Sequence, residues 1–359
     1  MTVIHTQESN PQAAQAAEQG MAASPATALR IASAPRAMTW QEQLQNAIGD
    51  VPSLLAAVGL TPEGPAPITD FPVRVPWAFV NRMRRGDWHD PLLLQVLSQS
   101  QEMTPVAGYG TDPVGEAQGA VAAQGIVHKY RGRVLLIVTG ACAVHCRYCF
   151  RRHFPYSEHQ NARRQWADTL AYIRNDSTIT EVILSGGDPL MASDAHLAGL
   201  VEEIGTIAHV TRLRVHSRMP VVLPDRITPG LVDALCHSRI NTVMVIHANH
   251  ANELNAEVKH GIDRLRAANI LSLNQAVLLA GINDSVQAQS DLSEKLFAIG
   301  VLPYYLHLLD KVQGAAHFDV AQARAVEIVQ QLRAALPGYL LPRLVREIDG
   351  EAAKVSINT

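Results

Sequence analysis

The chain has 359 residues, of which 47% are hydrophobic and 18% are charged, and its formal net charge is −3. This composition is that of a globular protein with a sizeable core and excludes a disordered or fibrous chain. A near-neutral charge without any block rich in lysine and arginine predicts no binding to nucleic acid. No apolar run approaches the roughly 18 to 20 residues of a membrane span, and residues 1–30 lack the apolar stretch of a signal peptide. We therefore expect a cytoplasmic protein with no membrane partner.

The first third of the chain is predicted to be a tail followed by short helices. Residues 1–37 are rich in Ala, Gln, Ser and Pro and show no periodicity, which predicts a disordered tail. The segment 38–128 is predicted to be a helical N-terminal region, with amphipathic helices in WQEQLQNAI, VPSLLAAVGL and PLLLQVLSQ. Thr39 is suited to cap the first of these helices.

Residues 129–338 are predicted to form repeated β-α units, because short apolar runs alternate there with amphipathic segments of helix length. The predicted strands are RVLLIVT, EVILS, RLRVHS, TVMVIH, LSLNQAVLL and PYYLHLL, with helices near 163–175, 194–208, 228–239, 252–269, 284–300 and 319–336. Six units predict an α/β fold of the partial (β/α)6 barrel type, and a doubly wound open sheet is the alternative. Residues 339–359 form a separate C-terminal segment.

Polar side chains gather where the predicted strands end. They are Cys142, Ser185 to Asp188, His216 to Arg218, His247 with Asn249, Gln275 and Asp310. Because active sites of parallel barrels form at the carboxyl ends of the strands, these groups are predicted to converge on one site.

Three of the four cysteines lie within eight residues, which is not the pattern of a disulfide framework. Cys142, Cys146 and Cys149 have the spacing C-x3-C-x2-C, and three thiolates can hold three irons of a [4Fe-4S] cluster while leaving the fourth iron open. A zinc site completed by His145 or His153 is the alternative. Cys236 stands apart in a predicted helix, where we expect a small buried apolar residue.

The cysteine motif resembles that of the radical S-adenosylmethionine superfamily. Tyr148 matches the aromatic residue before the third cysteine, and the run Ser185, Gly186, Gly187, Asp188 resembles the glycine-rich motif that holds the methionine part of the cofactor. The resemblance implies a [4Fe-4S] cluster, S-adenosylmethionine and an electron donor. We include His247 and Gln275 among the predicted cofactor-binding residues.

Longer motifs resemble the lysine 2,3-aminomutase family over roughly residues 95 to 357. They are VLLIVTGACAVHCRYCFRRHF, EVILSGGDPL, RVHSRMPVVLPDRIT, IHANHANE, LNQAVLLAGIND and PYYLHLLDKVQGAAHF. The resemblance implies an isomerase that also uses pyridoxal 5'-phosphate and moves an amino group from the α to the β carbon of an amino acid. It places the pyridoxal lysine at Lys354, although only Gly350 remains of the family's preceding glycine run. It places phosphate and ring contacts at Lys129, Tyr130 and Arg133.

The same resemblance implies L-lysine as the substrate. Arg151, with Arg152 beside it, matches the arginine for the substrate carboxylate, and Asp310 and Glu347 match two acids for the ε-ammonium. Because the chain stops five residues after Lys354, it resembles the short branch that makes (R)-β-lysine for modification of elongation factor P. That branch hands its product to a separate elongation factor P ligase.

Three other functions are compatible with these residues. The chain could be a free-standing aminomutase acting on lysine or another amino acid. It could be a radical enzyme that has lost pyridoxal phosphate, because the match around Lys354 is weak. A non-catalytic iron-sulfur or zinc protein would keep the cysteines but would have no use for Lys354 and Arg151.

Overall fold

The computed structural model describes residues 38–62, 71–116, 121–123, 125–156 and 166–358. The predicted tail at 1–37 and the first residues of the helix predicted from 163 lie outside the described residues. Residues 38–359 form one compact unit. The segment boundaries predicted at 128/129 and 338/339 therefore fall inside a single unit.

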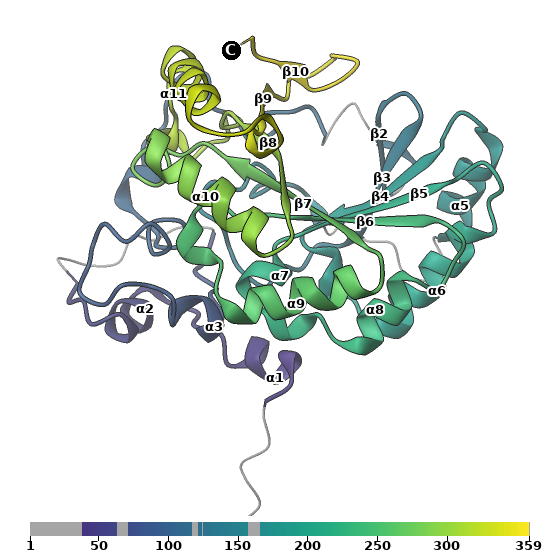
Figure 1. The fold of residues 1–359 in the computed structure, drawn as a ribbon, viewed down its shortest axis with the longest axis horizontal. Helices are drawn as coiled ribbons and strands as arrows, with labels where there is room; N and C mark the ends of the chain where they lie inside the picture. Colours follow the sequence, from purple (N-terminus) through teal and green to yellow (C-terminus); the bar gives the residue numbers. More distant parts are fainter. Residues whose placement is uncertain (1–37, 63–70, 117–120, 124, 157–165, 359) are drawn as a thin grey trace, which may run out of the picture. The chain divides into compact units, whose positions relative to one another are not determined.

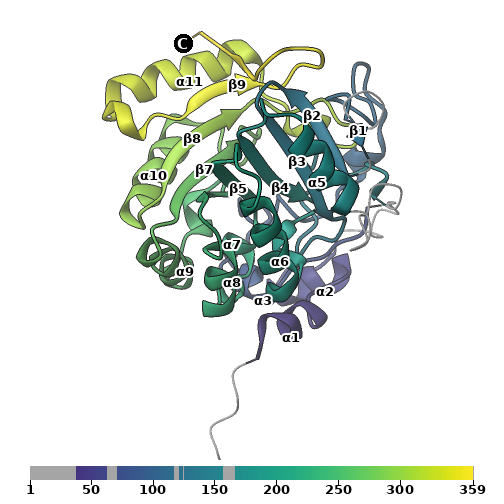
Figure 2. The ribbon, with the colours of Figure 1, turned by 90° about the vertical axis from the view of Figure 1, so that its right-hand side faces the viewer.

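Seven parallel strands form the body of a ten-stranded sheet in which the strands follow one another in chain order. They are β3 (Arg133–Thr139), β4 (Glu181–Gly186), β5 (Arg212–Ser217), β6 (Asn241–Ile246), β7 (Leu271–Val277), β8 (Leu302–His307) and β9 (Arg343–Arg346). The six predicted strands are confirmed. A doubly wound sheet would reverse its strand order, whereas this order never reverses and the strands follow an arc (Figure 2). The partial barrel is therefore confirmed and the doubly wound alternative is wrong.

The sheet extends beyond the predicted strands at both edges. Strands β1 (Val121–Ala123) and β2 (Ile126–Tyr130) run antiparallel ahead of β3, and β10 (Val355–Ser356) pairs antiparallel with β9. Strand β2 crosses the predicted boundary at 128/129, so the sheet begins inside the segment that was predicted to be helical. Strand β9 escaped prediction because its sequence, RLVR, contains only two apolar residues and gives no apolar run.

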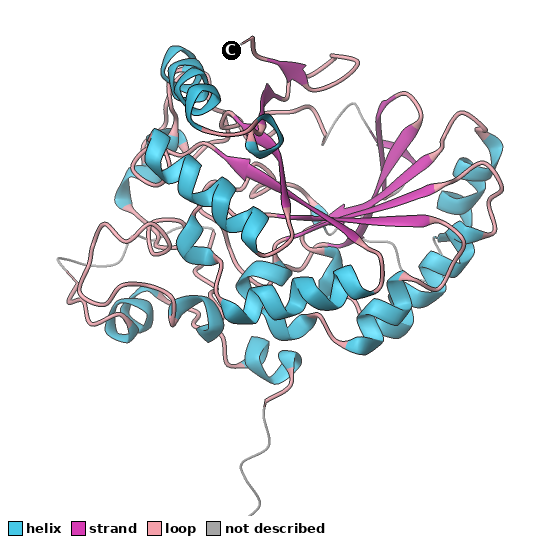
Figure 3. Cartoon of the chain, viewed as in Figure 1, coloured by secondary structure: helices cyan, strands magenta, loops and turns pink. Residues whose placement is uncertain are grey.

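The longer helices between the parallel strands cover the outer side of the arc (Figures 1 and 3). They are α5 (Trp166–Asn175), α6 (Asp194–Gly205), α8 (Pro229–Leu235), α9 (Ala256–Ala267), α10 (Val286–Ala298) and α11 (Gln322–Ala335). Each buries one apolar face; in α6, Leu197, Leu200, Val201 and Ile204 are buried. Side chains of Ser193, Thr228, Asn255 and Ser285 cap four of them. The inner side of the arc is left for a site.

The N-terminal region contains α1 (Trp40–Gln45), α2 (Val51–Ala57), α3 (Trp77–Val80) and the 3-10 turn η1 (Ser100–Met103). The helix predicted in PLLLQVLSQ is wrong, because residues 91–97 form turns. The Asp90 carboxylate accepts the backbone N–H groups of Leu92 and Leu93, both at 2.9 Å. Leu92, Leu93, Val96 and Leu97 are all buried, so the apolar run reflects packing on several sides and not one helical face.

The remaining short elements are α7 (Met219–Val222), η2 (Pro189–Met191), η3 (Pro224–Arg226), η4 (Ala251–Glu253), η5 (Ala316–Phe318) and η6 (Gly338–Leu340). The expectation that Cys236 is buried is wrong: it caps the carboxyl end of α8 and is exposed. Within the described ranges, no helix combines the length and the apolar character that a membrane span requires.

Candidate active site

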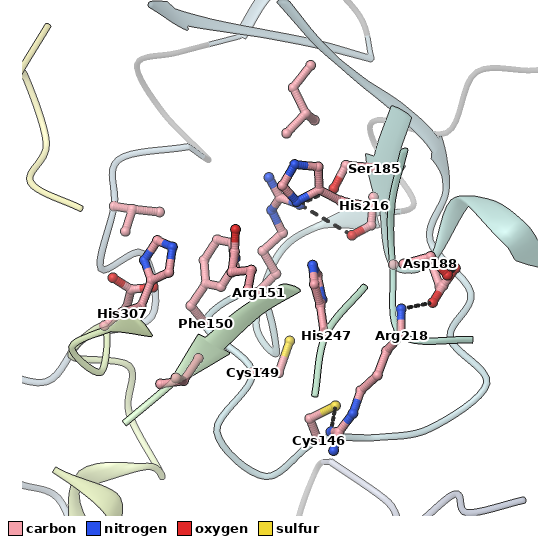
Figure 4. Close-up of a pocket in the computed structure, with 18 of the residues that line it drawn as sticks. Cys146, Cys149, Phe150, Arg151, Ser185, Asp188, His216, Arg218, His247 and His307 are labelled. Atoms are coloured by element: carbon pink, nitrogen blue, oxygen red, sulfur yellow. Dashed lines mark hydrogen bonds between the residues drawn. The ribbon is translucent and has the colours of Figure 1, made fainter. Parts of the chain in front are cut away.

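A cavity of about 360 Å³ lies where the parallel strands end. This volume is within the range of small-molecule sites, roughly 300 to 1,000 Å³. All of the predicted site residues line it, both those expected from the strand ends and those implied by the resemblance: Lys129, Tyr130, Arg133, Cys142, Cys146, Tyr148, Cys149, Arg151, Ser185, Gly186, Gly187, Asp188, His247, Gln275, Asp310, Glu347 and Lys354. Figure 4 shows several of them facing one another.

The cysteine loop follows β3 and turns its three thiols toward the cavity. The N–H of Cys149 donates to the carbonyl of Cys146 at 3.0 Å, which folds the loop tightly. No three His, Cys, Asp or Glu side chains of the described residues are already arranged as metal ligands. Burial and the neighbouring thiol of Cys149 raise the pKa of Cys142 well above its usual value, so metal binding has to displace protons. Three thiols on one loop suit a cluster that keeps one iron open.

The imidazoles proposed for a zinc site have other partners. His145 Nδ1 lies 2.8 Å from the carbonyl oxygen of Pro72, and its ring stacks on Phe71. His153 Nε2 lies 3.3 Å from the carbonyl oxygen of Gln313. This arrangement favours a site of three thiols over a zinc site.

Two glycines allow the end of β4 to pack against the cysteine loop. Gly186 has φ of +125°, and a Cβ atom there would lie 2.4 Å from the carbonyl oxygen of Thr139. A Cβ at Gly187 would lie 2.5 Å from the carbonyl oxygen of Ala141. Contacts this close exclude any side chain, so both glycines are needed for the approach of the two backbones.

Asp188 ties the ends of β4 and β5 together. Its carboxylate accepts hydrogen bonds from Ser217 Oγ at 2.7 Å and from the N–H groups of Arg218 at 2.9 Å, Leu190 at 3.0 Å and Met219 at 3.2 Å. Burial raises its pKa, although these hydrogen bonds oppose that effect. Because these protein groups occupy both carboxylate oxygens, we interpret Asp188 as a positioning residue of the predicted motif.

Arg218 joins the cysteine loop to a buried polar network that sequence reasoning missed. Its Nη1 lies 2.7 Å from Cys146 Sγ (Figure 4). Its Nη2 donates to Gln95 Oε1 at 2.6 Å and to Glu253 Oε2 at 3.2 Å. Gln95 comes from the N-terminal region and has no recognisable motif around it, whereas Glu253, in η4, ends the motif IHANHANE but was not singled out as a site residue.

Glu102 holds the cysteine loop from the other side and was also missed. It accepts Arg147 Nε at 2.8 Å and Arg152 Nη2 at 2.8 Å, and it also pairs with Arg147 Nη2. Burial alone would raise the pKa of Glu102, but the hydrogen bonds and charge of Arg147, with Arg152, hold it below its usual value. One acid from η1 thus fixes Arg147 and Arg152, on either side of Cys149.

Replacing Glu102 with alanine is expected to lower the free energy of unfolding by about 3 to 5 kcal/mol, because it leaves two buried guanidinium groups without an acid. Denaturant unfolding would measure the change. The matched control is Glu203→Ala, which removes the exposed pair with Arg174 and is expected to cost about 0 to 1 kcal/mol. Equal losses of unfolding free energy in the two variants would show that Glu102 does not stabilise the two buried arginines.

The wall of the cavity contains buried polar atoms that have no hydrogen-bond partner among the described residues. Besides the Nε atoms of Arg152, Arg214 and Arg218, they are His216 Nε2, His247 Nε2, Gln275 Oε1, His307 Nε2 and Asp310 Oδ1. Burial lowers the pKa of His247 to about 3 and the pKa values of His216 and His307 well below the usual value, so these rings are neutral. Buried polar atoms are normally satisfied, so this wall is built to receive a polar ligand. His216 belongs to the strand-end groups predicted to converge, and His307 extends that set.

Glu347 is the centre of a charged cluster beside Lys354. It accepts Lys354 Nζ at 2.6 Å and Lys129 Nζ at 3.3 Å, and the hydroxyl of Tyr130 also donates to it. Burial alone would raise the pKa of Glu347, but the charge of Lys354 lowers it to about 2. Asp310 lies in the same cavity, but its Oδ1 has no partner among the described residues. Asp310 and Glu347 were predicted to act alike, but they differ. Glu347 is already bound to two lysines, whereas Asp310 has one oxygen without a described partner.

Two arginines of the cavity are also in different situations. Arg133 lies 4.7 Å from the centre of the Tyr130 ring and has no acidic partner in the described part of the chain. Arg151 is buried against Glu116, with Nε at 2.6 Å and Nη2 at 3.0 Å from its carboxylate oxygens. Its Nη1 donates to Ser185 Oγ at 3.0 Å. Glu116 lies in no motif and was missed.

Comparisons with known proteins give a family match and several similar chains. Residues 136–288 match the model of the Radical SAM superfamily. Similar proteins include an L-lysine 2,3-aminomutase of Haemophilus influenzae, 48% identical over 88% of this chain and 94% of that protein. One of Escherichia coli is 44% identical over 90% of this chain and 96% of that protein. A solved radical SAM methyltransferase of Sphaerobacter thermophilus is 18% identical, with a TM-score of 0.45, over 64% of this chain and 71% of that chain.

Proposed function

Because the chain belongs to the lysine 2,3-aminomutase family of radical S-adenosylmethionine enzymes, we propose that it converts L-lysine to β-lysine by moving the α-amino group to the β carbon. One observation carries the proposal. A single cavity brings together three cysteines, a lysine, an arginine and an acid whose buried oxygen lacks a hydrogen-bond partner in the described part of the chain. A non-catalytic iron-sulfur or zinc protein has no use for the last three.

Membership in the radical S-adenosylmethionine superfamily implies a [4Fe-4S] cluster and S-adenosylmethionine. We propose that Cys142, Cys146 and Cys149 hold the cluster, and that the backbone at Gly186 and Gly187 receives the methionine part of the cofactor. When bound, the cluster and S-adenosylmethionine supply a radical that takes hydrogen from the substrate, and pyridoxal phosphate carries the nitrogen as it migrates. The chain's own task is to position these groups and keep water out.

The wall near Lys354 fits pyridoxal phosphate. Lys354 is close to the end of the chain and lies directly before β10, which pairs with β9. Arg133 is a cation without an acidic partner among the described residues, and Lys129 and Tyr130 lie on the neighbouring strand β2. We propose that these three residues bind the phosphate and the ring, because a doubly charged phosphate needs such a cationic surface.

The substrate is proposed to lie between a basic and an acidic residue. A guanidinium suits a carboxylate, which favours Arg151 for the α-carboxylate of lysine. Asp310 presents a buried oxygen without a described partner, which favours it for the ε-ammonium. Glu347 adds negative charge at that end only when it is released from Lys354. Glutamate would place a second carboxylate beside Asp310, so a basic amino acid fits better.

Lysine binding is expected to strengthen as pH rises through about 7. Burial raises the pKa of Asp310 to about 7, although the positive charge of Lys354 opposes this shift. Below this pH the carboxyl is neutral, and above it the ionised form attracts the ammonium. We expect KM for lysine to fall about tenfold between pH 6 and pH 8, in proportion to the ionised fraction.

The Asp310→Asn variant supplies the control for this dependence. Its amide does not ionise, so its KM should be high and flat over the same range. Steady-state kinetics with L-lysine at several pH values would measure both proteins. A wild-type KM that rises with pH, or a variant that keeps the wild-type profile, would assign the ammonium to another residue.

The function is tested by incubating the reconstituted, reduced protein with S-adenosylmethionine, pyridoxal phosphate and L-lysine without oxygen. Chiral chromatography with mass detection should show β-lysine. Cleavage of S-adenosylmethionine without β-lysine would leave the radical chemistry standing and remove the lysine proposal. A different β-amino acid formed from another substrate would identify a different aminomutase.

We further propose that the product is the R enantiomer and serves the modification of elongation factor P. Support for this step comes from the motif resemblance described above. The same chromatogram tests the enantiomer. Addition of a purified elongation factor P ligase and its factor should then give a factor heavier by one lysyl residue only when the product is present. An S product, or a product that the ligase refuses, would instead favour a free-standing aminomutase.

A further inference from the structure

The guanidinium of Arg151 is almost fully occupied by the protein itself. Its Nε and Nη2 bind the two carboxylate oxygens of Glu116 at 2.6 and 3.0 Å. Its Nη1 donates to Ser185 Oγ at 3.0 Å and to the carbonyl of Gly186 at 3.4 Å. These contacts use all but one of the five N–H groups of a guanidinium. A substrate carboxylate therefore cannot bind side-on unless one partner leaves.

Glu116 is the partner that can be exchanged for another carboxylate. Its two oxygens lie against the guanidinium edge as the two oxygens of an amino acid would. Both side chains are only 8% exposed, so water does not screen the pair. The backbone of Glu116 is held separately, because its N–H donates to the Asp112 carboxylate at 2.9 Å. Only the side chain has to turn away from Arg151.

The charges of the cavity do not permit both carboxylates to stay. Five other cations of the wall have acidic partners: Lys354 and Lys129 share Glu347, Arg152 pairs with Glu102, Arg214 with Glu181 and Arg218 with Glu253. Arg133 lies over the Tyr130 ring and is assigned to phosphate. Two carboxylates on the one buried guanidinium of Arg151 would leave a local net negative charge there, which is costly in a buried site.

We propose that Glu116 is a specificity-determining residue, which occupies the carboxylate position on Arg151 in the substrate-free protein and yields it to the α-carboxylate of the substrate. This inference rests on the proposed function. A ligand with an α-carboxylate replaces the negative charge that Glu116 withdraws, so the net charge beside Arg151 does not change. A diamine without that carboxylate leaves the pair closed. The site thereby selects amino acids over amines of the same length.

The test compares L-lysine with cadaverine, its analogue without the carboxylate. Calorimetric titration of the reconstituted protein with all cofactors but without reductant would give both Kd values without turnover. Glu116→Gln keeps the shape and removes the charge. We expect it to bind lysine about tenfold more tightly, the equivalent of one charged hydrogen bond, and to bind cadaverine as the wild type does. The matched control, Glu203→Gln, should change neither Kd.

A second readout and a second variant keep the test decisive. Glu116→Gln should unfold at a lower temperature than the wild type, and lysine should raise that temperature more in the variant. Glu116→Asp, whose shorter side chain reaches Arg151 less well, should shift the lysine Kd in the same direction if the glutamine variant does not fold. Equal or weaker lysine binding in these variants would show that Glu116 only holds Arg151 in place and would overturn the inference. If the wild type and both variants bind no lysine, the proposed function itself is wrong, and the role of Glu116 falls with it.

Discussion

Replacing Cys146 with alanine is expected to remove the iron-sulfur cluster and abolish all cleavage of S-adenosylmethionine. The cysteine loop supplies three thiols to the cavity, and a cubane with one open iron needs all three. Anaerobic reconstitution followed by iron and sulfide analysis should give about four irons per chain for the wild type and a large deficit for the variant. The product 5'-deoxyadenosine should fall to background.

Cys236→Ala is the matched control, because Cys236 is exposed and does not line the cavity. Its iron content and its cleavage of S-adenosylmethionine should equal those of the wild type. A Cys146→Ala protein that keeps a complete cluster would exclude this loop as the ligand set. One zinc per chain in the wild type after reconstitution with both metals would instead favour the zinc alternative.

The elements visible in the sequence are those with a repeating apolar pattern. Strands β3 to β8 are short apolar runs between helices, as expected for a sheet covered on its outer side. Their order fixes where Cys142, Gly187 and Asp310 come together, so the sequence alone predicts the convergence of the site. The four-residue strand β9 has no such pattern. The run at 91–97 has an apolar pattern, but it is buried on several sides and forms turns.

The acids that organise the site could not be predicted from the sequence, for a different reason. Glu102 precedes Arg147 and Arg152 by 45 and 50 residues, and Glu116 precedes Arg151 by 35 residues. No local motif marks either acid. Their importance comes from burial and from the charge they face, which only the folded chain reveals. Glu347 shows the same limit. Its position was predicted, but its hydrogen bond with Lys354 depends on the hairpin of β9 and β10.

Replacing Lys354 with alanine is expected to abolish covalent attachment of pyridoxal phosphate and all formation of β-lysine, while the cluster and the cleavage of S-adenosylmethionine remain. Attachment would be measured by borohydride reduction and mass analysis of the peptides. In the wild type the reduced adduct should lie on the peptide that contains Lys354. Lys295→Ala, in α10 and outside the cavity, is the matched control and should keep both attachment and activity.

Lys129 is the other lysine of the cavity wall, and its contacts make it the weaker candidate for attachment. Its Nζ donates to the carbonyl of Val114 at 2.6 Å and to Glu347 at 3.3 Å, and its side chain is only 8% exposed. Lys354 bonds Glu347 alone among the described residues, and its side chain is 23% exposed. Lys129→Ala should therefore weaken the binding of pyridoxal phosphate without removing the covalent bond. An adduct found on Lys129 would reverse the two roles, and Glu347 would then balance the charge of Lys354 throughout the reaction.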